Sequence, residues 1–311
     1  MRKSNYTFYD LLKLYKLRAA ARGFSPKTVR ATESNLRMIS QFFNLETKVR
    51  KFREEDYKKF LIALRKSDYS RETMYDLNAT LRKLINLARK QKLVKFDFSE
   101  TGNIRLNNSE EYKLISGEDF RKIREYFNER GEREFEFLFL LLYYTGIRIG
   151  EALALRREDF KIYPRERDGR ILVNKSYLYE FKLIKEPKNK KNRVVPIPRA
   201  VAKLFQETFE KTPVGERIFQ FSPNAANLAL KRAAKVKGVP EFHCHSFRHT
   251  YISNLARKRV PLPVISSVSG DTQKTVLSRY SHMFFEDEKL VLKALSAAEY
   301  AAKPEGYAKT K

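Results

Sequence analysis

Apolar residues recur every three to four positions through the first hundred residues, which is the spacing of amphipathic helices. Polar breaks separate four such stretches, which cover residues 6–22, 25–43, 53–66 and 70–90. The second stretch opens on Ser25-Pro26, a pair typical of a helix start because serine caps the helix and proline fits its first turn. The pattern predicts a small bundle of four helices.

The periodicity stops at residues 97–112, where Gly, Asn and Ser are frequent, as is typical of a linker. A new helix is expected just beyond it, because Ser116 and Asp119 have the spacing of a capping box. The sequence therefore predicts a helical domain at 1–96, a linker at 97–112 and a second domain at 113–311.

The second domain mixes helical periodicity with short strand-like stretches. The predicted helices cover 117–129, 133–144, 149–156, 199–211, 223–236, 246–258, 261–268 and 272–282, and the predicted strands cover 170–173, 180–184 and 193–197. A last helix at 285–302 carries Leu290, Leu292 and Leu295 on one face. The expected fold class is mainly α with a small β-sheet (α+β).

The charge of the chain narrows the choice of partner. Its 311 residues hold 64 Lys and Arg against 37 Asp and Glu, a net charge of +27, divided as +13 over residues 1–100 and +14 over the remainder. Such an excess calls for a polyanion, with nucleic acid the first candidate and an anionic membrane surface the second. Because the charge is spread over both domains, each is expected to hold phosphate by itself.

The lack of a long apolar segment and of a second cysteine narrows the class of protein further. The longest apolar run, residues 137–144, is far shorter than the roughly 18 residues of a membrane span. A single cysteine, Cys244, leaves no internal disulfide framework. We therefore expect a reduced, cytoplasmic protein that does not enter a membrane.

Four segments of the second domain carry candidate chemistry. In the first, Arg148 follows a Thr-Gly turn between two helices, where it either serves a site or satisfies carbonyl groups. In the second, His245 and Arg248 lie three apart on a predicted helix, so that an imidazole and a guanidinium share a face and can hold one phosphate. A zinc site remains an alternative here, with the ligands His243, Cys244, His245 and His249.

The other two segments flank these. Residues 185–196 form a strongly basic stretch that we interpret as a hairpin turn between two strands, or as a solvated run of charge. Tyr280 stands near the end of the last helix of the domain, where it is either a nucleophile or a half-buried packing residue.

In this order the four segments resemble the tyrosine recombinase family of integrases and Xer-type resolvases. The resemblance covers nearly the whole chain, with residues 1–95 similar to the family's core-binding domain and about 113–290 similar to its catalytic domain. It implies that Arg148 and Arg248 clamp the scissile phosphate, that His245 hydrogen-bonds it, and that Tyr280 attacks it to leave a 3′-phosphotyrosyl bond.

The resemblance also implies a lysine general acid that protonates the departing 5′ oxygen. Counting back from the Val-Val-Pro strand selects Lys188, with Lys190 and Lys191 as close alternatives.

One position departs from the family pattern. The family has histidine or tryptophan after a glycine, nine residues before the tyrosine, whereas here Gly270 is followed by Asp271. We include Asp271 among the site residues, and two roles compete for it. It either N-caps the helix that carries Tyr280, which we favour, or it engages an arginine of the site.

We therefore expect a site-specific DNA recombinase that needs no metal and no cofactor, and the resemblance implies that it works as a tetramer on two paired duplex DNA sites. The alternatives are a type IB topoisomerase-like nicking and closing enzyme and a DNA-binding protein without catalysis. The expected DNA contacts are Lys27, Arg30, Arg71, Lys83, Lys190, Lys191 and Arg193.

Overall fold

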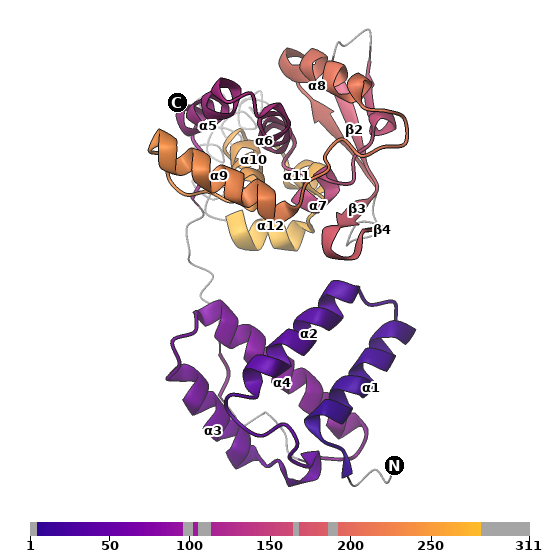
Figure 1. The fold of residues 1–311 in the computed structure, drawn as a ribbon, viewed down its shortest axis with the longest axis vertical. Coiled ribbons are helices and arrows are strands. Elements are labelled where there is room, and N and C mark those ends of the chain that lie inside the picture. The colour runs from indigo at the N-terminus through magenta and orange to yellow at the C-terminus, as the bar shows by residue number, and fades with distance from the viewer. Residues whose placement is uncertain (1–4, 96–101, 105–112, 164–167, 186–191, 281–311) are drawn as a thin grey trace, which may run out of the picture. The chain divides into compact units, whose positions relative to one another are not determined.

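The computed structural model describes residues 5–95, 102–104, 113–163, 168–185 and 192–280. The chain divides into two compact units, residues 1–110 and 111–311 (Figure 1). Among the described residues, no helix is both long enough and apolar enough to cross a membrane.

The first unit contains the four predicted helices. They are α1 (Phe8–Ala21), α2 (Pro26–Ile39), α3 (Glu54–Arg65) and α4 (Arg71–Lys90), with a short 3-10 turn, η2 (Val49–Lys51), between α2 and α3. Their apolar stripes meet in one core, in which Phe8, Leu36, Leu64 and Leu84 are fully buried. Ser70 caps α4 as expected, since its hydroxyl accepts a hydrogen bond from the N–H of Thr73.

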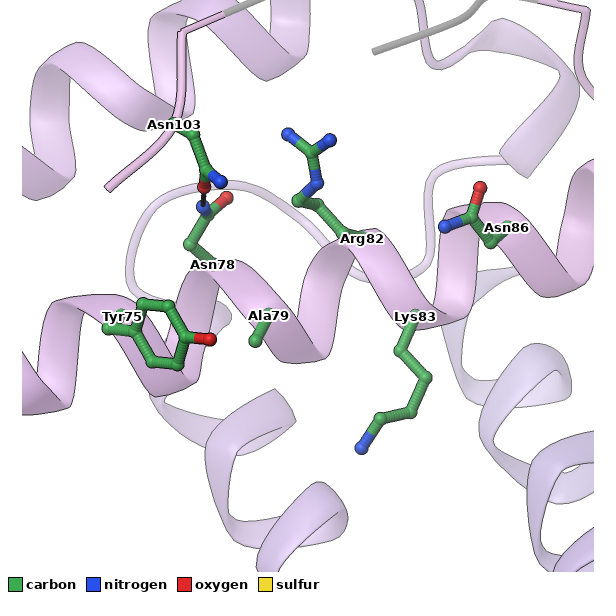
Figure 2. Close-up of a pocket in the computed structure, with 7 residues that line it drawn as sticks. All are labelled: Tyr75, Asn78, Ala79, Arg82, Lys83, Asn86 and Asn103. Atoms are coloured by element: carbon green, nitrogen blue, oxygen red, sulfur yellow. Dashed lines mark hydrogen bonds between the residues drawn. The ribbon is translucent and has the colours of Figure 1, made fainter. Parts of the chain in front are cut away.

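Part of the segment expected to be a linker packs on the first unit. The side chain of Ile104 is buried in the core of that unit, and Asn103 accepts a hydrogen bond of 2.8 Å from Asn78 of α4. Figure 2 shows this bond at one end of a pocket of about 330 Å³ along α4. Arg82 and Lys83 line the same pocket.

The second unit contains eight described helices. They are α5 (Gly117–Glu129), α6 (Arg133–Thr145), α7 (Ile149–Ala152), α8 (Arg199–Lys211), α9 (Pro223–Lys237), α10 (Cys244–Arg257), α11 (Leu262–Ser269) and α12 (Gln273–Tyr280). The prediction that α7 extends to residue 156 was wrong. Leu153, Ala154 and Leu155 are all buried, and the carbonyl groups of Leu153 and Leu155 accept hydrogen bonds from Arg217 and Ile218 instead of continuing the helix.

Two small antiparallel sheets lie between α7 and α8 in the sequence. One has the order β1 (Phe160–Ile162), β2 (Gly169–Val173), β5 (Arg193–Ile197); the other pairs β3 (Ser176–Leu178) with β4 (Leu183–Lys185). Short 3-10 turns, η3 (Arg157–Asp159) and η4 (Tyr179–Phe181), precede β1 and join β3 to β4. The interpretation of residues 185–196 as a hairpin between two paired strands was wrong, because β4 pairs with β3 while β5 pairs with β2; residues 186–191 themselves lie outside the described residues.

The core of the second unit surrounds α6. Residues 137–142 of this helix are buried on every side, between the neighbouring helices and the inner face of the three-stranded sheet. A smaller cluster joins α10, α11 and α12 through Ile252, Ile265, Val276 and Tyr280. The predicted site residues belong to the elements that border these two clusters.

Candidate active site

Arg148 is fixed by the turn between α6 and α7. α6 ends at Thr145 and is capped by Gly146, whose φ of 58° lies in the left-handed region that favours glycine. A side chain at this position would meet the ring of Tyr251, 2.4 Å from the added Cβ. Arg148 then caps α7, with its N–H 2.9 Å from Glu151 Oε2 and its Nη1 3.1 Å from Glu151 Oε1. The turn holds the guanidinium in place while leaving 28% of the side chain exposed.

Arg248 is held almost entirely inside the protein. It lies on α10, and its Nη1 and Nη2 donate hydrogen bonds of 2.8 Å to the carbonyl oxygens of Gly146 and Ser269. These oxygens belong to the ends of α6 and α11, so three helices fix one guanidinium. Only 2% of the side chain is exposed.

Asp271 joins the two arginines. Its Oδ1 lies 2.5 Å from Arg148 Nη2, and its Oδ2 lies 2.7 Å from Arg248 Nη2. Burial alone would raise the pKa of Asp271, but the charge and hydrogen bond of Arg248, followed by Arg148, hold it below its ordinary value. The carboxylate is therefore ionised at neutral pH.

The favoured N-cap role for Asp271 was wrong. α12 begins at Gln273, and Thr272 caps it, because the hydroxyl of Thr272 accepts a hydrogen bond from the N–H of Thr275. The alternative role, engagement with an arginine, is the one the structure shows.

Glu151 and Arg193 extend this cluster inward. Arg193 donates to both oxygens of Glu151, at 3.1 and 2.6 Å, and its Nε donates to the carbonyl oxygen of Val268. Burial alone would raise the pKa of Glu151, but Arg193 and then Arg148 hold it below its ordinary value. The prediction of a DNA contact at Arg193 was therefore wrong, because this side chain is buried and serves the interior.

A sequence signal for these two residues existed. Glu151 lies three residues after Arg148, the spacing of a capping box. In β5, Arg193 shares the inward face with Val195 and Ile197, since alternate residues of a strand point to the same side.

His245 lies one helical turn before Arg248 on α10. Its pKa is lowered to about 4, first because packing removes part of its hydration and then because Arg248, His243 and Arg148 repel its positive form. The ring is therefore neutral at pH 7 and can donate or accept one hydrogen bond at each nitrogen.

The zinc alternative has no ligand set in the part of the chain that the structure describes, where no three His, Cys, Asp or Glu side chains converge. Cys244 is buried, and burial raises the pKa of its thiol to about 12.

Tyr280 ends α12 with its side chain inside the protein. It is 2% exposed, and its hydroxyl lies 2.6 Å from Nδ1 of His249. His249 in turn meets the ring of His245 edge to face, with centroids 4.7 Å apart. This pairing was not predicted from the sequence, in which the spacing of His249 suggested only a zinc ligand.

Several residues that were predicted as site or DNA-contact residues do not belong to this cluster. Lys188, Lys190 and Lys191, as well as the helix expected at 285–302, lie outside the described residues. Lys27, Arg30, Arg71 and Lys83 belong to the first unit and have exposed side chains. Lys83 also donates a hydrogen bond to Thr32 of α2 and lies 5.3 Å above the ring of Tyr15.

The buried histidine predicts a loss of stability in mild acid. His249 has its pKa lowered to about 3, by burial first and then by repulsion from the protonated form of His245 and from Arg279, whereas its ordinary value is 6.5. Between these two values the unfolded chain binds the extra proton, so the free energy of unfolding should fall as the pH falls below about 6.5. The slope should reach about 1.4 kcal/mol per pH unit for this group.

Urea unfolding at a series of pH values between 7 and 5 measures this slope. His249→Asn does not titrate and keeps a polar atom near the position of Nδ1, so it should reduce the slope by about the contribution of this group, while His245, whose pKa is also lowered to about 4, keeps its own contribution. An equal slope in both proteins would contradict the assignment. Below about pH 4, protonation of Asp271 and Glu151 should add a further loss, since their lowered pKa values stabilise the fold only above that range.

Two arginines from different helices converge on one anion, a histidine lies one turn before the buried arginine, and a tyrosine stands on the adjacent helix. This fold and this set of side chains define a tyrosine-dependent enzyme that breaks and rejoins phosphodiester bonds. Residues 114–287 match the phage integrase family, and this match covers more than half of the chain. The chain belongs to the phage integrase family and is a site-specific recombinase.

Curated relatives agree with this membership. A tyrosine recombinase of Thermosipho africanus is 24% identical over 296 residues, which cover 89% of this chain and 96% of the relative. The prophage ps2 probable integrase of Lactococcus lactis is 26% identical, over 90% of this chain and 80% of its own.

Solved structures share the fold. The Tn1549 transposon integrase in complex with transposon right end DNA superposes with a TM-score of 0.73 at 18% identity, over 94% of this chain and all of that one. A lambda integrase tetramer bound to a Holliday junction superposes with a TM-score of 0.65 at 14% identity, over 87% and 79%.

Proposed function

We propose that this recombinase cuts duplex DNA at specific sites by attack of Tyr280 on a phosphodiester held by Arg148 and Arg248. The observation that carries the proposal is the convergence of these two guanidinium groups on the two oxygens of one carboxylate, at 2.5 and 2.7 Å. A phosphodiester also presents two non-bridging oxygens, and guanidinium groups bind such oxygens in the same way.

The positive charges of Arg148 and Arg248, which are already held in place, stabilise the transition state. As the tyrosine attacks, negative charge grows on the non-bridging oxygens, and two fixed arginines stabilise it without moving. Three helices hold Arg248, and Glu151 holds Arg148, so neither side chain has to reorganise during the reaction.

We assign the remaining protons as follows. The phenol of Tyr280 has an ordinary pKa near 10 and needs an acceptor for its proton. His249, neutral and 2.6 Å away, holds this hydroxyl before attack. His245, also neutral, hydrogen-bonds the phosphate and is proposed to take up the proton of Tyr280 as its oxygen bonds to phosphorus. Lys188, with Lys190 and Lys191 as alternatives, is proposed to protonate the departing 5′ oxygen.

The partner we propose is duplex DNA, bound by both units in a tetramer that pairs two sites. The net charge of +27 supports this, as do the exposed basic side chains Lys27 and Arg30 on α2 and Arg71 on α4. Among the structural neighbours, integrases are bound to DNA and one is a tetramer on a Holliday junction. The proposed place of action is the cytoplasm.

The experiment is incubation of the protein, in EDTA, with duplexes that carry candidate attachment sites and a nick just beyond the cut. A band that combines protein and labelled DNA on a denaturing gel is the expected result, because the nick lets the short fragment with the released 5′ hydroxyl diffuse away and prevents religation. Activity that dies with chelator and returns with Mg²⁺ or Zn²⁺ would overturn the mechanism.

The same assay separates the alternatives. A topoisomerase-like enzyme would form the adduct and relax supercoiled plasmid without exchanging strands between two sites. A protein without catalysis would bind the duplexes tightly and form no adduct.

A further inference from the structure

The phosphate clamp is already filled in the DNA-free protein. Asp271 contributes one carboxylate oxygen to each arginine, at 2.5 and 2.7 Å, so the carboxylate takes the place that two phosphate oxygens would take. Both nitrogens that bind it are terminal Nη2 atoms, the atoms most suited to reach a ligand from outside.

Arg248 has little capacity to bind a second anion while Asp271 is present. Its Nη2 carries two hydrogens, and these go to the carbonyl oxygen of Ser269 and to Asp271. One hydrogen of its Nη1 goes to the carbonyl oxygen of Gly146. Because only 2% of the side chain is exposed, a phosphate cannot reach Arg248 until Asp271 has moved.

We propose that Asp271 is an internal competitor for the scissile phosphate, which enters the Arg148–Arg248 clamp only by displacing this carboxylate. The inference rests on the proposed function of the clamp and adds a step before cleavage. Its consequence is selectivity: contacts elsewhere on the DNA must supply the energy of displacement, so stray phosphates and weakly held DNA leave the clamp closed.

The charges of the cluster support competition. Along the chain of contacts the signs alternate: Arg193, Glu151, Arg148, Asp271, Arg248. With Asp271 in place, two carboxylates offset two of the three guanidinium charges. When Asp271 leaves, the two arginines that face the phosphate lose their shared counter-ion, and their attraction for a phosphate increases.

Asp271 can leave without unfolding its surroundings. Its own carbonyl oxygen accepts a 2.6 Å hydrogen bond from the hydroxyl of Ser266, and its N–H donates to Ser269 Oγ at 3.3 Å. These bonds hold the backbone, while the carboxylate can turn about the side-chain bonds. At 12% exposure the side chain already reaches the surface.

The first test uses DNA-free protein and inorganic phosphate as the probe. Asp271→Asn keeps the size of the side chain and removes its charge, and Glu210→Gln makes the same change on the exposed end of α8 as a matched control. The free energy of unfolding is measured against phosphate concentration at constant ionic strength, because an anion that binds the folded state stabilises it by mass action.

We expect the apparent phosphate affinity of Asp271→Asn to exceed that of the wild type and of Glu210→Gln by about tenfold, or about 1.4 kcal/mol. Adding Arg148→Ala to Asp271→Asn should abolish the gain, which locates it at the clamp. Equal affinities in all proteins would overturn the proposal. The proposal would also be overturned by an Asp271→Asn or Asp271→Ala protein that stays unfolded in high phosphate, because the proposal requires that an external anion can replace the carboxylate.

The second test is single-turnover cleavage of nicked DNA, in which Asp271→Asn should form the covalent adduct faster than the wild type. A slower reaction in a folded variant would mean that Asp271 orients the arginines instead, and would overturn the inference. The two proposals fail separately: if no protein forms an adduct, the recombinase mechanism fails while the phosphate titration still decides the competition.

Discussion

Tyr280→Phe is expected to bind DNA as the wild type does and to form no covalent adduct. The substitution deletes the attacking oxygen and little else, because phenylalanine fills nearly the same volume in the cluster formed by α10, α11 and α12. Denaturing electrophoresis of labelled, nicked DNA measures the adduct, and electrophoresis under native conditions measures binding.

Tyr251→Phe is the matched control for this experiment. Tyr251 lies on α10 with its ring against Gly146, beside the clamp, and it should keep the adduct. An adduct that persists in Tyr280→Phe would falsify the assignment of the nucleophile. Loss of the adduct in Tyr251→Phe as well would trace the effect to packing around the clamp.

The same substitution reports on the resting position of Tyr280. The hydroxyl lies 2.6 Å from His249 Nδ1 inside the protein, so its removal should lower the free energy of unfolding by about 1 kcal/mol. His249→Ala removes the same hydrogen bond from its other side and should also lower the free energy of unfolding.

Local pattern was sufficient for most of the helices. The helices at 117–129 and 199–211 were predicted with the bounds that the structure shows, because caps and apolar stripes are properties of neighbouring residues. The three-residue strands β1 and β3 were not predicted, since three residues carry too little alternation to be distinguished from a loop.

The pairing of the strands could not be predicted from the sequence, for a different reason. The basic stretch 185–196 was interpreted as a hairpin turn between two strands, but β4 and β5 pair with strands of different sheets. That choice depends on which face of each strand is buried, and the burial comes from helices far along the chain.

The site residues show the same limit of prediction from local sequence. Spacing within the sequence placed His245 and Arg248 on one helical face and Tyr280 on a later helix. The partner of Asp271 could not be found this way, because Arg148 lies 123 positions away and a cap was the nearest local explanation. Ion pairs of this kind are properties of the folded state alone.

Arg248→Ala is expected to reduce the rate of cleavage by about 10²–10³-fold, the usual effect of losing one preorganised donor to a transition-state charge. Arg148→Ala should have a loss of the same order, since each arginine faces one oxygen of the anion. Single-turnover formation of the covalent adduct at saturating DNA measures both.

The Arg148→Ala and Arg248→Ala variants should differ in their free energy of unfolding even though their losses of cleavage rate are alike. Arg248→Ala leaves the carbonyl oxygens of Gly146 and Ser269 without their donor in the interior and removes a partner of Asp271, so its free energy of unfolding should fall by about 3–5 kcal/mol. Arg148 is 28% exposed, and Glu151 keeps its two bonds to Arg193, so Arg148→Ala should lose much less. Urea unfolding of both variants gives the comparison, and Arg248→Lys tests it further, because one ammonium cannot serve two carbonyl groups and a carboxylate in the planar geometry of a guanidinium. If Arg148→Ala proved as unstable as Arg248→Ala, the exposed arginine would be holding the fold together, and its role as a poised phosphate ligand would have to be abandoned.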